Sequence, residues 1–235
     1  MVKEFILNPY SFRIDEQVKI KIFIKSYLCC VFVSGLMTLL LISLNMTFFN
    51  GAFGHRLQSS GLYESDINPI FLAVSIVLLG PVVEEITCRL PLKITRFNIV
   101  AAISCFVLLS LLPPWNELDG SYHQALIALG GAMLFGILTF ILLSKWMCEC
   151  LSRIEGKYLV FGLTCFFALM HLFNFSLSEI DIVYLWAAPF FVLPQFITGY
   201  FLAFIRLKIN FPAAILFHML INVPGSIHVL MNNIN

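Results

Sequence analysis

Residues 69–93 have the sequence PIFLAVSIVLLGPVVEEITCRLPLK, an apolar run that carries Glu84, Glu85 and Arg89 near its end. The run is long enough to cross the hydrocarbon core of a bilayer as a helix. A charged side chain inside a bilayer costs at least about 2.5 kcal/mol to insert, so charged residues there generally mark a functional site. The stretch therefore predicts a membrane helix that contains an ionisable site.

The composition of the whole chain also indicates a membrane protein. Of its 235 residues, 60% are hydrophobic and 11% are charged, against roughly 25% charged residues in ordinary globular domains. A chain of this length cannot bury so much apolar surface in water, so we expect an all-α, polytopic integral membrane protein. The net charge of +1, without a basic tract, gives no sign of nucleic-acid binding. The seven cysteines follow no disulfide or four-cysteine zinc pattern.

Hydropathy predicts about seven membrane spans and a cytoplasmic N-terminus. The expected spans cover residues 26–49, 69–90, 97–112, 124–146, 158–175, 183–205 and 211–231. With the N-terminus inside, only Arg56 among the 14 basic residues falls on the outer side, in agreement with the positive-inside tendency. We expect residues 1–25 to form a cytoplasmic amphipathic segment and residues 26–235 a single transmembrane domain. In a prokaryote the membrane would be the cell membrane.

Helical spacing predicts how the polar residues of the spans interact. Glu85 and Arg89 are four residues apart on one helix face and can neutralise each other. Glu84 lies about 100° around the helix and needs another partner. His171 and His218 are the candidates, since a count of about 1.5 Å per residue places both at depths that overlap with Glu84 once helices tilt.

These residue types fit the hydrolysis of a carbonyl compound by water. A carboxylate in an apolar pocket can act as a general base, and His218 with Asn222, four residues later, can aim hydrogen-bond donors at one oxyanion. Glu84, His171 and His218 are also a plausible set of zinc ligands with an open water position. The residues alone leave both versions open.

Three motifs in the chain resemble those of the CAAX-protease and bacteriocin-processing family, also called Abi, which includes the type II CAAX prenyl endopeptidases. They are Glu84-Glu85-x-x-x-Arg89, Phe167-x-x-x-His171 and His218-x-x-x-Asn222. The resemblance extends from about residue 69 to residue 224. Cys88 and Leu90 depart from it, because the family commonly has an aromatic residue before the motif's arginine and a glycine after it.

The resemblance implies an intramembrane endopeptidase that acts on a CAAX-like tail or a bacteriocin-type precursor peptide. Glu84 would activate water with help from His171, and His218 and Asn222 would stabilise the oxyanion. Glu85, Arg89 and Phe167 would support the site. Of the metal-free and zinc-dependent versions, we favour the one without a cofactor.

Two other functions fit the sequence. A catalytically inactive immunity or interaction protein of the same fold would bind a partner in the membrane. A proton-coupled transporter is less favoured, because no inverted repeat is evident.

Overall fold

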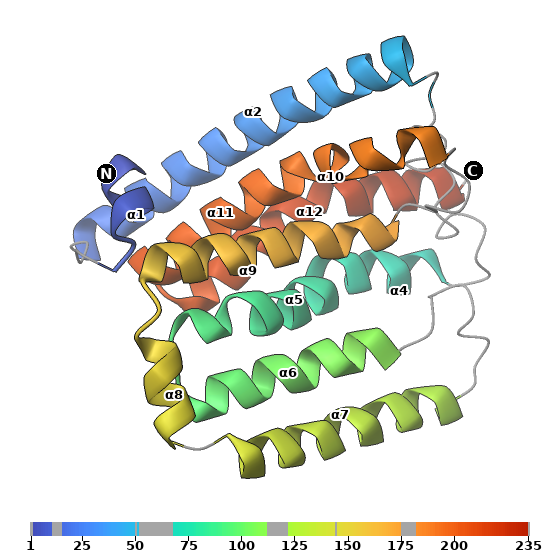
Figure 1. Cartoon of the computed structure of the whole chain (residues 1–235). Coiled ribbons are helices and arrows are strands. Elements are labelled where there is room, and N and C mark those ends of the chain that lie inside the picture. The colour runs from blue at the N-terminus through green and yellow to red at the C-terminus, as the bar shows by residue number, and fades with distance from the viewer. Residues whose placement is uncertain are drawn as a thin grey trace.

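The computed structural model describes residues 2–10, 16–49, 51, 68–111, 122–143, 145–174 and 182–234, and nearly all of them are helical, with no strand among them. The long helices lie side by side, and α8 (Lys145–Ser152) runs across the end of the bundle at which α1 (Val2–Leu7) lies (Figure 1). The other long elements are α2 (Glu16–Phe48), α6 (Arg96–Leu111), α7 (Tyr122–Leu142), α9 (Gly156–Met170), α11 (Leu193–Lys208) and α12 (Phe211–Ile234).

One rod of the bundle is built from several helical pieces. It begins with α4 (Pro69–Val74), continues through a π-helical turn η1 (Ser75–Leu79) into α5 (Gly80–Cys88), and ends in a 3-10 turn η2 (Leu90–Leu92). Asn68 caps its start, because the side-chain oxygen accepts the N–H of Ile70 at 2.9 Å. The rod that contains α11 is also composite, with a 3-10 turn η6 (Ile182–Ala187) and α10 (Ala188–Phe191) before it.

Four helices of the described residues are long and apolar enough to cross a membrane: Val18–Phe48, Pro69–Leu92, Val183–Lys208 and Phe211–Met231. Each corresponds to an expected span. The other three expected spans correspond to shorter apolar helices, Arg96–Leu111, Leu126–Leu142 and Gly156–Met170. The expected ends at residues 112 and 175 lie outside the described residues.

The outer faces of the bundle are apolar. On α2, Phe32 and Leu39 are 71% and 66% exposed, and on α7 the exposed fractions of Ile127 and Ile141 are 70% and 66%. A water-soluble monomer rarely leaves contiguous apolar surface of this kind exposed. Lipid is the solvent that fits these faces, so the fold is that of an α-helical membrane protein.

Helix α11 packs against α2, α9 and α12. Its buried Leu202 and Ile205 belong to the same core as Phe167 of α9 and Phe217 of α12. Helix α12 in turn packs against α4, the π-helical turn η1 and α5. The three rods that carry the predicted motifs are therefore in contact through α11 and α12.

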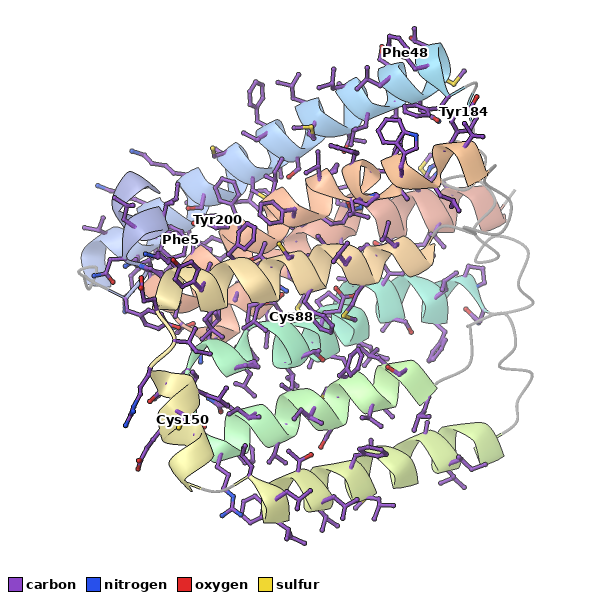
Figure 2. The ribbon with its side chains drawn as sticks, in the orientation of Figure 1. Phe5, Phe48, Cys88, Cys150, Tyr184 and Tyr200 are labelled. Carbon is purple, nitrogen blue, oxygen red and sulfur yellow. The ribbon has the colours of Figure 1, made fainter. Side chains whose placement is uncertain are left out.

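The N-terminal segment is attached to the bundle rather than separate from it. Phe5 of α1 is buried edge-on against Tyr200 and Phe204 of α11, with ring centroids 5.5 Å and 5.0 Å away (Figure 2). The Tyr10 hydroxyl donates a hydrogen bond to the carbonyl of Leu92. The expected boundary between residues 25 and 26 falls inside α2, which begins at Glu16.

Candidate active site between α5, α9 and α12

Glu85 forms the centre of a buried charge cluster. Its side chain is fully buried, and its Oε1 atom lies 3.0 Å from Nδ1 of His218 and 3.7 Å from a guanidinium nitrogen of Arg89. The ion pair with Arg89 was expected from their spacing, and the structure contains it. The contact with His218 was not expected, because helical spacing predicted only Arg89 as a partner of Glu85. Glu85 thus joins α5 to α12.

Glu84 approaches His218 from the other side of the imidazole. Its Oε2 atom is 3.8 Å from Nε2 of His218, longer than a hydrogen bond. The Glu84 side chain is 25% exposed, against 0% for Glu85. The Oε2 atom itself is buried and makes no hydrogen bond to any described residue. Glu84 is therefore the more exposed of the two carboxylates that flank His218, and its Oε2 atom is free to accept a hydrogen bond.

The hydrogen bond to Glu85 defines what His218 can do. When Nδ1 carries a proton and donates it to the Glu85 carboxylate, Nε2 is an acceptor in the neutral ring and a donor in the imidazolium. Nε2 is the nitrogen that faces Glu84. The same ring can therefore accept a hydrogen bond from water or donate one to an oxyanion, depending on its protonation.

Phe167 connects the rest of the cluster. The Arg89 guanidinium stacks on its ring, with Cζ 3.9 Å from the ring centroid, a geometry that favours a buried cation. Both imidazoles contact the same ring, with centroid distances of 4.7 Å for His171 and 5.7 Å for His218. The phenyl ring thus brings the second motif against the first and the third.

His171 is held by the end of its own helix. It follows the last residue of α9, and its Nδ1 atom is 2.8 Å from the carbonyl oxygen of Phe167. If Nδ1 donates this bond, Nε2 of the neutral ring is left as an acceptor. The structure places His171 beside Phe167, as the spacing predicts.

Asn222 and His218 bond to different parts of the composite helix that carries Glu84 and Glu85. Its Nδ2 atom donates a hydrogen bond of 3.0 Å to the carbonyl oxygen of Ile76, in the π-helical turn before α5. One N–H of the amide is therefore used on the main chain. The expectation that His218 and Asn222 direct their donors at one point was derived from helical spacing alone and did not include this bond.

Gly199 is a further residue of the site that its motifs did not predict. A Cβ atom at this position of α11 would lie 2.8 Å from Cδ1 of Phe167 and 2.9 Å from a terminal nitrogen of Arg89. Glycine therefore lets α11 approach the cluster closely. The signal in the sequence was a glycine inside an apolar helix. Gln195, one turn earlier on α11, also has a buried side-chain oxygen without a hydrogen bond to any described residue.

The described residues contain no group of three or more His, Cys, Asp or Glu side chains arranged to hold one metal ion. His218 directs Nδ1 to Glu85, and His171 directs Nδ1 to a main-chain carbonyl. These bonds leave the Nε2 atom of each ring as the one that could ligate a metal, and the zinc-dependent version with Glu84, His171 and His218 stays a prediction.

The fold and this site define an α-helical membrane protein with a buried Glu–Arg–His cluster next to a partly exposed glutamate. Comparison of the chain with protein-family models, with curated proteins and with solved structures finds no match.

Proposed function

We propose that this protein is an intramembrane endopeptidase that uses Glu84 to activate water. The observation that carries the proposal is the distance of 3.8 Å between Oε2 of Glu84 and Nε2 of His218, next to a fully buried Glu85. The motif resemblance supports the same assignment. In this proposal the chain crosses the membrane seven times with its N-terminus in the cytoplasm, and the site lies toward the cytoplasmic end of α5.

The charges of the cluster divide the two glutamates between two roles. Glu85 is within ion-pair distance of Arg89 and hydrogen-bond distance of His218, so its charge is compensated and it orients the imidazole. Glu84 has a longer contact with His218, its side chain is partly exposed, and its buried Oε2 atom accepts no hydrogen bond from any described residue. A general base must reach the proton of its water and remain accessible to it. Glu84 meets this requirement better than Glu85 does.

The reaction begins when Glu84 removes a proton from water and the water oxygen bonds to the carbonyl carbon of the scissile peptide. The carbonyl oxygen becomes an oxyanion, to which Nε2–H of the His218 imidazolium donates a hydrogen bond. Glu84 then transfers its proton to the leaving nitrogen, and the C–N bond breaks to give a carboxylic acid and an amine. His171 assists the proton transfers through its Nε2 atom.

The motif resemblance implies a share in the oxyanion site for Asn222. One N–H of its amide is bonded to Ile76, so such a share would need the other N–H. The resemblance also supplies the substrate class, a CAAX-like C-terminal tail or a bacteriocin-type precursor peptide that the membrane lipid delivers to the site.

The test is cleavage of quenched fluorescent peptides, with and without a prenyl group, by the purified protein in lipid nanodiscs. We expect Glu84→Gln and His218→Ala to lower the rate by at least about 100-fold, in the range for loss of a general base or an oxyanion donor. His228→Ala, an exposed histidine on the same helix as His218, is the matched control and should keep the wild-type rate.

The alternative is a non-catalytic immunity or interaction protein of the same fold. The observation that favours it is the hydrogen bond from the Asn222 amide to the Ile76 carbonyl, which occupies one of the donors that an oxyanion site would use. If wild type cleaves no peptide of the panel and Glu84→Gln keeps the biological phenotype, the endopeptidase proposal fails and this alternative takes its place.

A further inference from the structure

The π-helical turn before α5 leaves one main-chain carbonyl without its usual donor. The N–H of Gly80 donates to the carbonyl of Ser75, five residues earlier, and is the N–H that Ile76 would use in a regular α-helix. In the π-helical register the next donor to Ile76 would be residue 81, which is proline and has no N–H. Neither register therefore supplies Ile76 with a main-chain donor.

Asn222 of α12 supplies that donor. Its Nδ2 atom lies 3.0 Å from the Ile76 oxygen. In the hydrocarbon region of a bilayer, where water is not at hand, an unpaired main-chain carbonyl is costly. A side-chain amide from a neighbouring helix is thus used in place of the N–H that Pro81 lacks.

At a second proline of the chain, a side chain from another helix also donates to the main-chain carbonyl that the proline leaves without a donor. Pro224 lies inside α12 and cannot donate to the carbonyl of Leu220, four residues earlier. The hydroxyl of Tyr27, on α2, donates to that carbonyl at 3.3 Å. At both prolines a polar side chain of another helix replaces the missing main-chain donor, so the contact of Asn222 follows a pattern in this fold.

The position of Asn222 relative to His218 links this contact to the candidate site. The two residues are one helical turn apart on α12, and they bond to the same rod on opposite sides of Pro81: Asn222 to Ile76 before it, and His218 to Glu85 after it. A π-helical turn adds one residue to the helix, which rotates all later residues by about 100° relative to an uninterrupted α-helix. The two bonds together fix that rotation.

We propose that Asn222 is a positioning residue, whose amide replaces the N–H missing at Pro81 and thereby fixes the rotation at which α5 presents Glu84 and Glu85 to His218. The consequence for cleavage rests on the proposed endopeptidase function, whereas the consequence for stability does not. A direct role at the oxyanion is the alternative for the same residue.

A double substitution separates the two roles, because Pro81→Ala returns an N–H that can donate to Ile76 in the π-helical register. We expect Asn222→Leu to lower the thermal midpoint of the purified protein by about 5 °C and the cleavage rate by at least about tenfold. The double variant Pro81→Ala/Asn222→Leu should recover the midpoint to within about 2 °C and the cleavage rate to within about threefold.

Pro224 provides the matched control. Pro224→Ala should restore the midpoint of a Tyr27→Phe variant, since it returns the donor to Leu220, but it should not restore Asn222→Leu. A general gain of stability from removing any helix proline would restore both, and would overturn the proposal.

The remaining outcomes are also decisive. Recovery of the midpoint without recovery of cleavage would overturn the positioning role in favour of a direct one, and an unchanged midpoint in Asn222→Leu would overturn it altogether. If the wild type cleaves no peptide, the endopeptidase proposal fails by itself. Recovery of the midpoint by Pro81→Ala and not by Pro224→Ala would then still support Asn222 as the donor to Ile76.

Discussion

Substitution of Gly199 by alanine tests whether the close approach of α11 holds the cluster together. The added Cβ atom would lie 2.8 Å from Phe167 and 2.9 Å from Arg89, with Thr164 at 3.2 Å. Ordinary contacts of a Cβ atom begin near 3.4 Å, so the methyl group overlaps two neighbours by about half an ångström. All three neighbours are at most 2% exposed and cannot move into solvent.

The expected cost follows from two opposing effects. Overpacking a rigid core costs about 1–3 kcal/mol, and replacing glycine by alanine inside a helix returns up to about 1 kcal/mol. The net destabilisation should be about 1–2 kcal/mol, or a fall of about 2–8 °C in the thermal midpoint of a chain of this size. The loss of cleavage should be larger, at least about tenfold, because Phe167 contacts both imidazoles and Arg89 contacts Glu85. Small displacements at a catalytic site lower the rate strongly.

The assay is thermal unfolding of the protein in detergent, followed by peptide cleavage in nanodiscs well below the midpoint. Gly162→Ala on α9 is the matched control, since nothing lies within 4 Å of a Cβ atom there, and it should keep the midpoint or raise it slightly. A Gly199→Ala protein that is as stable as the control and cleaves at the wild-type rate would refute the idea that α11 holds Phe167 and Arg89 in place.

Three further predictions follow from the contacts. Glu85→Gln should lower the free energy of unfolding by about 3–5 kcal/mol, because it leaves the buried charge of Arg89 without its partner. Glu84→Gln should keep the wild-type thermal midpoint while losing cleavage. Equal midpoints for the two variants would contradict the assignment of a structural role to Glu85 and a catalytic role to Glu84. Tyr10→Phe should lower the midpoint by about 2–4 °C through loss of the hydrogen bond to Leu92. Burial raises the pKa of Tyr10 above 10.0, so wild type should lose stability as pH rises from about 10 through the raised pKa; a Tyr10→Phe variant with the same alkaline loss would show that other groups cause it. Cleavage should survive chelators, and loss with chelator followed by recovery with zinc would establish a metal-dependent reaction instead.

The parts of the site that depend on short helical spacing could be predicted from the sequence. Glu85 with Arg89 and Phe167 with His171 are pairs four residues apart, and the structure contains both contacts. A hydrophobic run of the right length likewise predicted the helix that carries Glu84. Such inferences need only the geometry of one helix, which the residues themselves define.

The contacts between helices could not be predicted in the same way. The sequence-based prediction assumed a regular α-helix, paired Glu85 with Arg89 alone and left both histidines to Glu84. The π-helical turn Ser75–Leu79 instead changes the rotation of every later residue of this helix. His218 therefore bonds to Glu85 and lies farther from Glu84, and Asn222 bonds to Ile76. Gly199 could not be predicted either, because its role depends on the side chains of Phe167 and Arg89, which other parts of the chain bring next to it.

The energetics of the cluster are an argument for function rather than for stability. Burying Glu85, Arg89 and His218 requires the removal of their hydration, and their mutual attraction roughly offsets that cost at best. Apolar side chains of similar volume would pack the same space at no such cost, particularly in lipid. The cluster instead places the second carboxylate, Glu84, 3.8 Å from an imidazole that Glu85 already orients. A chain that only needed a stable bundle would gain nothing from that arrangement, and a hydrolase that must keep one base accessible would.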